Sequence, residues 1–405
     1  MLEKIFELTK HQTTIRKEVL AGITTFMTMA YILAVNPSIL SEAGMDKNAL
    51  FTATSLAAII GTLIMAFVAK YPFALAPGMG LNAFFAYTVV IGMGYSWQFA
   101  LTAVFLEGVI FILLTVFNIR ELIVNSIPIN IKHSISAGIG LFIAFIGLQS
   151  AGVIVKDPAT LVKLGDMGSP AVLIAVLGIL FMGILLVFKV KGALLIGILL
   201  ATIAGIPAEI TNISNGSLLS TPPSLEPIFF KFDFSRIFTV DMLIILFTFL
   251  FVDMFDTVGT LIGVSDKAGM LNSKGHLPYA KQALFADSIG TTAGAILGTS
   301  TVTTYVESAS GVAEGGRTGL TALTVAIMFA LALFLAPVFT MIPTAATAPA
   351  LVLVGLFMLS PVKNIDLDDY SEAIPAFLTI IIMPLSYSIA EGIVFGMLSY
   401  VLLKL

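Results

Sequence analysis

The chain has 405 residues, of which 58% are hydrophobic and 11% charged, with a formal net charge of −4 and a mean hydropathy of +1.05. Soluble globular chains average about 25% charged residues, so this composition excludes that class and indicates a polytopic membrane protein. The absence of cysteine excludes disulfides, thiolate catalysis and thiolate metal sites.

The N-terminal stretch MLEKIFELTKHQTTIRKEVL is charged and amphipathic. It lacks the apolar core and cleavage site of a signal peptide, so we expect the first span to be retained. The three histidines, His11, His133 and His276, lie near predicted span ends, and no two share the spacing of metal ligands. We therefore expect interfacial histidines and no metal site.

Apolar runs long enough to span a bilayer recur from residue 19 to the C-terminus. They predict fourteen membrane segments, at residues 19–37, 50–69, 73–92, 97–117, 133–150, 170–188, 192–210, 239–263, 279–297, 300–315, 319–341, 345–360, 373–388 and 389–404. The third opens with FALAPGMGLN and the tenth with GTSTVTTYVE. Their Gly, Pro and Thr content predicts broken segments rather than plain helices.

The distribution of Lys and Arg predicts the orientation of these segments. If the N-terminus lies in the cytoplasm, 15 of the 20 basic residues fall on the inner side. The other five fall on the outer side, and they are Lys47, Lys156, Lys163, Lys231 and Arg236. We therefore expect both termini in the cytoplasm and a location in the plasma membrane.

The longest hydrophilic connection, residues 211–238, is too short for a domain and is expected to be an extracytoplasmic linker. It separates a first half (1–210) from a second (239–405), each with seven segments, and an odd number forces the second half to run inverted. Broken segments at equivalent places in two inverted halves are typical of the substrate site of a secondary transporter.

Carboxylates expected away from the membrane surface are the main candidates for function, because a charge at mid-bilayer costs roughly 2.5–3.5 kcal/mol on insertion scales. They are Glu107, Asp253, Asp256, Asp287, Glu307 and Glu391. Asp253 and Asp256, three residues apart, share one helix face. Two close carboxylates cannot both ionise comfortably in a dry site, so one should hold a proton, as proton coupling requires. A hydrogen-bonded structural pair is the alternative.

Glu307 lies among small and hydroxyl residues, Thr303 included, which predicts an irregular backbone around a cavity. Asn82 lies in the matching broken segment and offers both a donor and an acceptor, which suits a heterocyclic amide. We expect Glu107 and Asp287 to brace the helices around the site. Glu314 and Glu391, which lie close to predicted segment ends, are also expected to be structural.

Paired acids in a site with no intramembrane Lys or Arg disfavour an anionic substrate and suit a neutral, flat molecule with N–H donors, or a cation; Lys281 and Lys404 lie at the inner ends of their spans. Aromatic rings near the acids, such as Phe255, could stack on such a molecule, although simple packing is the commoner role of phenylalanine. The alternatives are an anion exchanger on the same inverted-repeat scaffold, an ion channel, and an intramembrane protease with an aspartate dyad.

Four stretches, at 20–40, 74–90, 251–264 and 298–322, together resemble the adenine/guanine/hypoxanthine permease branch of the nucleobase transporter superfamily. The resemblance implies an all-α polytopic fold of fourteen segments as a 7+7 inverted repeat, with short strands in segments three and ten. It also implies a core domain (19–117 and 239–341) and a gate domain (133–210 and 345–404), with substrate between the strands and segment eight.

The resemblance further implies roles for individual residues. Asp253 matches the acid that contacts the base, Glu307 the acid that accepts from its ring N–H groups, and Asn82 the amide linked to transport. Asp256 matches a second position tied to function and to proton coupling. Pyrimidine-transporting relatives show Glu and His at the two segment-eight places, where this chain has Asp twice, and that difference favours purines.

These observations predict a secondary transporter that imports a purine nucleobase by proton symport with alternating access. Substrate binding is assigned to Asp253, Glu307, Asn82, Thr303 and Phe255, and proton coupling to Asp256, Asp253 and Glu307. We expect no enzyme activity and no cofactor apart from the coupling proton. The expected partners are the purine base, the lipid bilayer and a second copy in a homodimer, and no nucleic acid.

Overall fold

The computed structural model describes residues 2–117, 128–211, 217–272 and 277–405. Arg120, Lys274 and His276 lie outside the described residues, as does part of the predicted linker. The chain forms two compact units, each built from two separate stretches. The first unit comprises Met1–Val124 and Ser217–Thr340, and the second comprises Asn125–Gly216 and Met341–Leu405.

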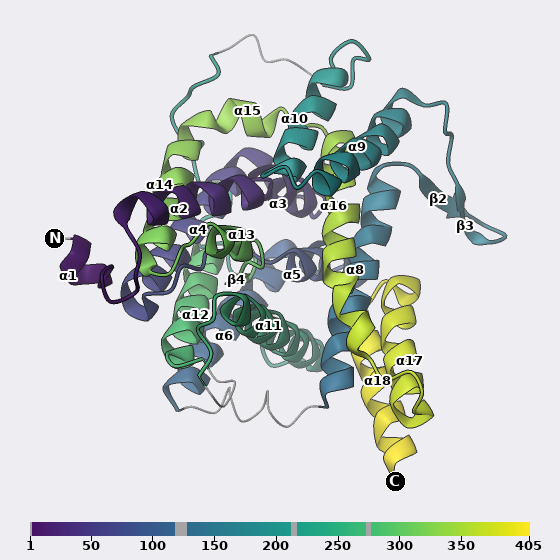
Figure 1. Ribbon diagram of the computed structural model, residues 1–405. Helices are drawn as coiled ribbons and strands as arrows, with labels where there is room; N and C mark the ends of the chain where they lie inside the picture. The colour runs from purple at the N-terminus through teal and green to yellow at the C-terminus, as the bar shows by residue number, and fades with distance from the viewer. Residues whose placement is uncertain (1, 118–127, 212–216, 273–276) are drawn as a thin grey trace. The chain divides into compact units, whose positions relative to one another are not determined.

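The first unit is a helical assembly that contains one pair of short strands (Figure 1). Its elements are α1 (Leu2–Phe6), α2 (Ile15–Met29), α3 (Ile32–Ser41), α4 (Lys47–Ile64), the π-helical turn η1 (Met65–Ala69), β1 (Leu75–Pro77), α5 (Met79–Ala83), the π-helix η2 (Phe84–Gly92), α6 (Trp97–Val116), α11 (Val240–Lys267), α12 (Ala280–Leu297), β4 (Val302–Thr304), α13 (Ser308–Ala313), α14 (Gly319–Ala332), the 3-10 turn η3 (Leu333–Leu335) and α15 (Ala336–Thr340).

Polar side chains set where several of these helices begin. Thr14 accepts from the Lys17 amide, and Asp46 accepts from the Ala49 amide, so each satisfies an N–H group that has no partner inside its helix. The Thr14 cap starts α2 at Ile15, four residues before the predicted first segment. That segment is also two helices rather than one, because α2 ends at Met29 and α3 begins at Ile32.

The described part of the second unit comprises six α-helices, one 3-10 helix and a β-hairpin. Its elements are α8 (Ile129–Ser150), β2 (Ile154–Asp157), β3 (Leu161–Leu164), α9 (Pro170–Val187), α10 (Ala193–Ala204), α16 (Thr344–Leu359), the 3-10 helix η4 (Ser360–Asn364), α17 (Tyr370–Ser386) and α18 (Ile389–Lys404).

Glycines on α8 allow its backbone to contact the backbone of α16 directly. A Cβ at Gly140 would lie 2.5 Å from the carbonyl oxygen of Gly355, and a Cβ at Gly147 would lie 3.0 Å from that of Ala348. Small residues of this kind let helices approach closely where lipid supplies no hydrophobic drive between them. The packing of the second unit therefore depends on the absence of side chains along this contact.

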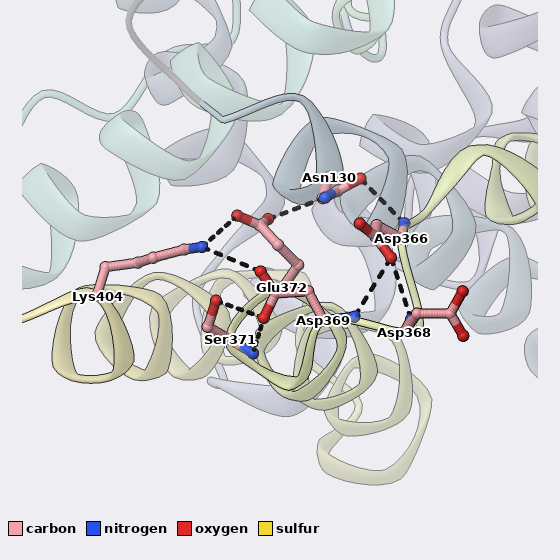
Figure 2. Close-up of polar contacts among 7 residues, drawn as sticks. All are labelled: Asn130, Asp366, Asp368, Asp369, Ser371, Glu372 and Lys404. Carbon is pink, nitrogen blue, oxygen red and sulfur yellow. Dashed lines mark hydrogen bonds and ion pairs between the residues drawn. The ribbon is translucent and has the colours of Figure 1, made fainter.

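One end of the second unit is held by polar contacts (Figure 2). Asn130 at the start of α8 donates to Glu372 over 2.9 Å, and Glu372 pairs with Lys404 at the end of α18, also over 2.9 Å. Asp369 caps α17 by accepting from both the backbone amide and the hydroxyl of Ser371. These hydrogen bonds hold the pKa of the Asp369 carboxyl below its usual range. The contacts join α8, α17 and α18.

The hairpin β2–β3 was not predicted. Asp157 closes it by accepting from the amides of Ala159 and Thr160, and it pairs with Lys163 over 2.9 Å. The Lys163 ammonium and these amides lower the pKa of the Asp157 carboxyl to about 2. Its strands are only four residues long and lie in the connection between the predicted segments 133–150 and 170–188.

Eight described helical spans are long and apolar enough to cross a membrane, and three shorter apolar helices accompany them. Each of the fourteen predicted segments overlaps at least one described helix. Segments three and ten contain β1 and β4, each followed by a short helix, so the predicted broken segments are confirmed. The halves, linker and core and gate boundaries stay predictions.

Candidate functional site

The strands β1 and β4 form an antiparallel pair inside the first unit. Leu75 pairs with Thr304, Ala76 with Thr303, and Pro77 with Val302. All of these residues are buried. The pair is continued on both sides by the Gly78 amide donating to Thr301 and the Tyr305 amide donating to Ala74, each over 2.9 Å.

Two threonines satisfy the strand backbone from neighbouring helices. The Thr62 hydroxyl of α4 accepts from the Leu75 amide over 2.9 Å and donates to its carbonyl oxygen over 3.1 Å. The Thr291 hydroxyl of α12 makes the same pair of contacts with Val302, at 3.2 and 3.0 Å. Extended backbone is tolerated at membrane depth only when its polar groups find partners. The two threonines supply them in matching fashion.

Helix α11 brings a buried hydroxyl and carboxyl to β4. The Thr257 hydroxyl lies 3.0 Å from Asp253 Oδ1 and 2.7 Å from Thr303 Oγ1. It also lies 2.7 Å from Oδ1 of Asp287, which belongs to α12. Asp253, Thr257 and Asp287 are fully buried and Thr303 is 2% exposed. The predicted site residues Asp253 and Thr303 are therefore joined through Thr257, which sequence reasoning missed.

Asp256 directly precedes Thr257 in α11 and is only partly buried. A Cβ at Gly78 would lie 3.7 Å from its Oδ2, so the carboxyl lies against the end of β1. It is also close enough to Asp287 and Glu307 to interact with their charges. Of the two segment-eight aspartates, Asp256 is thus the accessible one and Asp253 the enclosed one.

Glu307 lies where β4 turns into α13 and is partly buried. The hydroxyl of Tyr31, at the junction of α2 and α3, donates to Glu307 Oε1 over 2.7 Å. Tyr31 is 1% exposed. Tyr305 donates its own hydroxyl to the Pro77 carbonyl oxygen over 2.5 Å. Tyr31 was absent from the predicted site, because nothing in its local sequence shows that the tenth segment lies beside it.

Asn82 lies at the opposite end of β4 from Glu307. Its side-chain oxygen accepts from the Ser300 hydroxyl. Its Nδ2 is buried and has no hydrogen-bond partner in the described part of the chain. A buried donor without a partner costs about 1–3 kcal/mol, so this amide is a candidate to bind a ligand acceptor.

Phe255 is not joined to this network by a described contact. Its ring packs edge-on against Phe251 with the centroids 4.6 Å apart. On a helix it projects almost opposite Asp253 and Thr257, since two residues correspond to about 200° at 3.6 residues per turn. Its assignment to substrate binding stays a prediction.

The remaining carboxylates divide into buried and surface groups. Glu107 accepts from the Thr301 hydroxyl over 2.5 Å and so connects α6 to the residues before β4. Glu18, which was not considered, is fully buried and accepts from the amides of Arg317 and Thr318 and from the Thr321 hydroxyl. Glu314 is the C-cap residue of α13, and Glu391 is exposed in the first turn of α18.

Residues 16–395 match the family model Xan_ur_permease, described as the Permease family. This chain belongs to that family. The permease is a membrane transporter and not an enzyme. It is 45% identical over 405 residues to the adenine permease AdeP of Escherichia coli strain K12, covering 100% of this chain and 91% of AdeP. It is also 45% identical to the guanine/hypoxanthine permease PbuG of Bacillus subtilis strain 168 over 410 residues, covering 98% and 93% of the two chains.

The permease also resembles a solved structure, the transmembrane domain of the cyanobacterial bicarbonate transporter BicA. The TM-score is 0.67 with 17% identity, and the match covers 94% of this chain and 97% of that domain. Identity this low shows the fold alone. Together with the helices and short strands described above, it confirms the predicted inverted-repeat transporter fold.

Proposed function

We propose that this permease imports a purine nucleobase, adenine, guanine or hypoxanthine, by proton symport with alternating access. The relatives named as adenine and guanine/hypoxanthine permeases, each 45% identical over nearly the whole chain, support the purine class. The observation that carries the proposal is the partly buried Glu307 carboxyl, held by Tyr31 beside the strand pair.

The chemistry of these groups suits a planar base. Tyr31 occupies Glu307 Oε1, which leaves Oε2 to accept a ring N–H group. Asp256, the accessible aspartate at the end of β1, can accept a second N–H group, and the Asn82 amide can donate to a ring nitrogen. A site built on such contacts discriminates strongly, because a wrong base leaves buried polar groups unpaired.

Asp253 is fully buried and its carboxyl is already hydrogen-bonded to Thr257, so it is better suited to hold a proton than to contact the base. We therefore propose Glu307 and Asp256 for the base and Asp253 for coupling, with the proton as the coupling ion and no other cofactor. Carboxyl, hydroxyl and amide groups are the described polar side chains around the strands, and this argues against the anion exchanger. The similarity to BicA concerns the fold only.

For alternating access we propose that the first unit acts as the core domain and the second as the gate domain, as in repeat-built transporters generally. The distribution of Lys and Arg favours cytoplasmic termini in the plasma membrane. A homodimer is proposed as well, and cross-linking in native membranes would test it.

Uptake of labelled adenine, guanine and hypoxanthine by cells lacking purine permeases tests the function directly. We expect uptake of at least one base, loss of accumulation on adding an uncoupler, and no competition by uracil. Asp256→Asn should lower uptake, while Glu391→Gln, on the exposed first turn of α18, should not. Uptake that the uncoupler leaves unchanged would exclude symport.

A further inference from the structure

The Thr257 hydroxyl lies within hydrogen-bond distance of more acceptors than it can serve. Two of its three neighbours are carboxyl oxygens, Asp253 Oδ1 at 3.0 Å and Asp287 Oδ1 at 2.7 Å. The third is the Thr303 hydroxyl at 2.7 Å, where either oxygen can be the donor. A hydroxyl has one hydrogen to donate and two lone pairs to accept with. Thr257 can therefore donate to only one of the two carboxyls.

The other carboxyl contact requires a hydrogen on the carboxyl itself. If both acids were ionised, two anionic oxygens would approach the same hydroxyl inside a fully buried cluster. Those oxygens are at most 5.7 Å apart, the sum of their contacts to Thr257. At such a separation in a dry site two carboxylates do not both ionise readily. A single added proton satisfies all three contacts of the Thr257 hydroxyl.

We infer that Asp253, Thr257 and Asp287 together hold the coupling proton, so that Asp287 is a proton-binding residue and not only a brace. The inference rests on the proposed symport. In one arrangement Asp287 donates its hydrogen to Thr257, which donates its own to Asp253. In the other, the Asp287 hydrogen has moved to Thr257 and the Thr257 hydrogen to Asp253. The number of hydrogens is the same in both.

The cluster is surrounded by other acids that raise the cost of a further negative charge. Asp256 follows on the same helix, and Glu307 lies four residues beyond Thr303. Glu107 of α6 accepts from Thr301, the residue that precedes β4. Tyr31 and Tyr305 face Glu307 and the strand pair as neutral donors. Thr303 connects the proton site to the strand that leads to Glu307, so a base that displaces β4 changes the contacts of Thr257.

The test uses the full-length protein, purified and reconstituted in liposomes, with labelled adenine, guanine and hypoxanthine. Exchange without a gradient and accumulation driven by a pH gradient are measured separately. A gradient of one pH unit supports roughly tenfold accumulation at one proton per base. We expect Asp287→Asn and Thr257→Val to accumulate no base above equilibrium under that gradient, while any exchange continues. Thr257→Ser should restore accumulation, because it restores the hydroxyl.

Thr248→Val is the matched control, since Thr248 is a buried threonine of the same helix whose hydroxyl donates to the Ile244 carbonyl oxygen. It should accumulate base as the wild type does. Infrared difference spectra in H2O and D2O give a second readout that needs no transport. The wild type and Thr248→Val should show a protonated-carboxyl band that Asp287→Asn and Thr257→Val lose or shift.

Accumulation by Asp287→Asn at the wild-type level, or a band that neither variant changes, overturns the inference. A wild type that exchanges none of the three bases contradicts the proposed function instead, and the infrared result then still decides where the proton lies. If Asp287→Asn does not fold, the contrast between Thr257→Val and Thr257→Ser gives the same decision.

Discussion

The two units of the permease bury different chemistry. Among its described residues, the first unit encloses four fully buried carboxylates, which are Glu18, Glu107, Asp253 and Asp287. In the second unit, the buried polar side chains of the described residues are Asn, Ser and Thr. Its described carboxylates lie at partly buried or exposed positions, among them Asp157 in the hairpin and the carboxylates of Figure 2.

This difference indicates that the first unit, and not the second, carries the desolvation cost of buried carboxyls. Burying a carboxyl at membrane depth is costly, so such groups are expected where they take part in function or hold the backbone around a functional site. The second unit instead packs α8 against α16 through glycine contacts. Substitutions that remove charge should therefore act on transport in the first unit, and substitutions that add volume should act on stability in the second.

The largest expected effect is that of Glu307→Gln. An amide cannot accept from Tyr31 and from a base as a carboxylate does, so kcat/KM for uptake should fall roughly 100-fold, which corresponds to about 2.7 kcal/mol. Glu372→Gln is the control, because it neutralises a carboxylate of the second unit that binds Asn130 and Lys404. Equal losses in the two variants would remove the contrast between the units.

Gly140→Ala should come next, and it should act on stability. The new methyl group would lie 2.5 Å from the Gly355 carbonyl oxygen, so α8 and α16 must separate, at a cost of about 2 kcal/mol in the free energy of unfolding. Gly183→Ala, in α9 of the same unit, adds its methyl group where no other atom lies within 4 Å. Thermal unfolding in detergent should separate the two variants, and similar melting temperatures would show that this contact is not tight.

Tyr31→Phe should weaken substrate binding about tenfold, or about 1.4 kcal/mol, because a hydrogen bond to a charged group is lost while the ring remains. Unfolding should change little, since the aromatic ring still fills its place. Binding of labelled purine to purified protein measures the effect. An unchanged dissociation constant would show that Glu307 needs no help from Tyr31.

The smallest effect concerns Asp157 in the hairpin of the second unit. Its folded pKa, about 2, lies below its ordinary value of 3.8, so its contribution to hairpin stability is present above pH 3.8 and is lost as the pH falls towards about 2. Hydrogen exchange of the hairpin amides should show this loss in the wild type but not in Asp157→Asn. Purine uptake at neutral pH should be the same in both proteins.

The sequence was sufficient for the spans and for the strand-bearing segments, because both depend on local composition. Long apolar runs predict helices. FALAPGMGLN and GTSTVTTYVE contain the Gly, Pro and Thr residues that interrupt a membrane helix and allow a short strand there. The hairpin at 154–164 was missed because its strands are only four residues long and lie at partly buried or exposed positions, so they carry little hydrophobic pattern.

The site was predicted less completely, since its contacts join segments far apart in the chain. Asp253 and Glu307 were identified by their charge, but their partners Thr257 and Tyr31 are an ordinary threonine and tyrosine locally. The carboxyl joined to Asp253 through Thr257 is Asp287, thirty residues beyond Thr257, rather than Asp256 on the same helix. Glu18 was missed because the first segment was predicted to begin at residue 19.

The pairing of β1 with β4 also has a consequence for biogenesis. Leu75–Pro77 cannot complete their backbone hydrogen bonds until Val302–Thr304 have been synthesised, more than two hundred residues later. During that interval the ribosome and insertion machinery must keep the third segment away from lipid, where unpaired amides are not tolerated. A nascent chain arrested before residue 302 should therefore remain bound to the translocon and sensitive to proteases at residues 70–80.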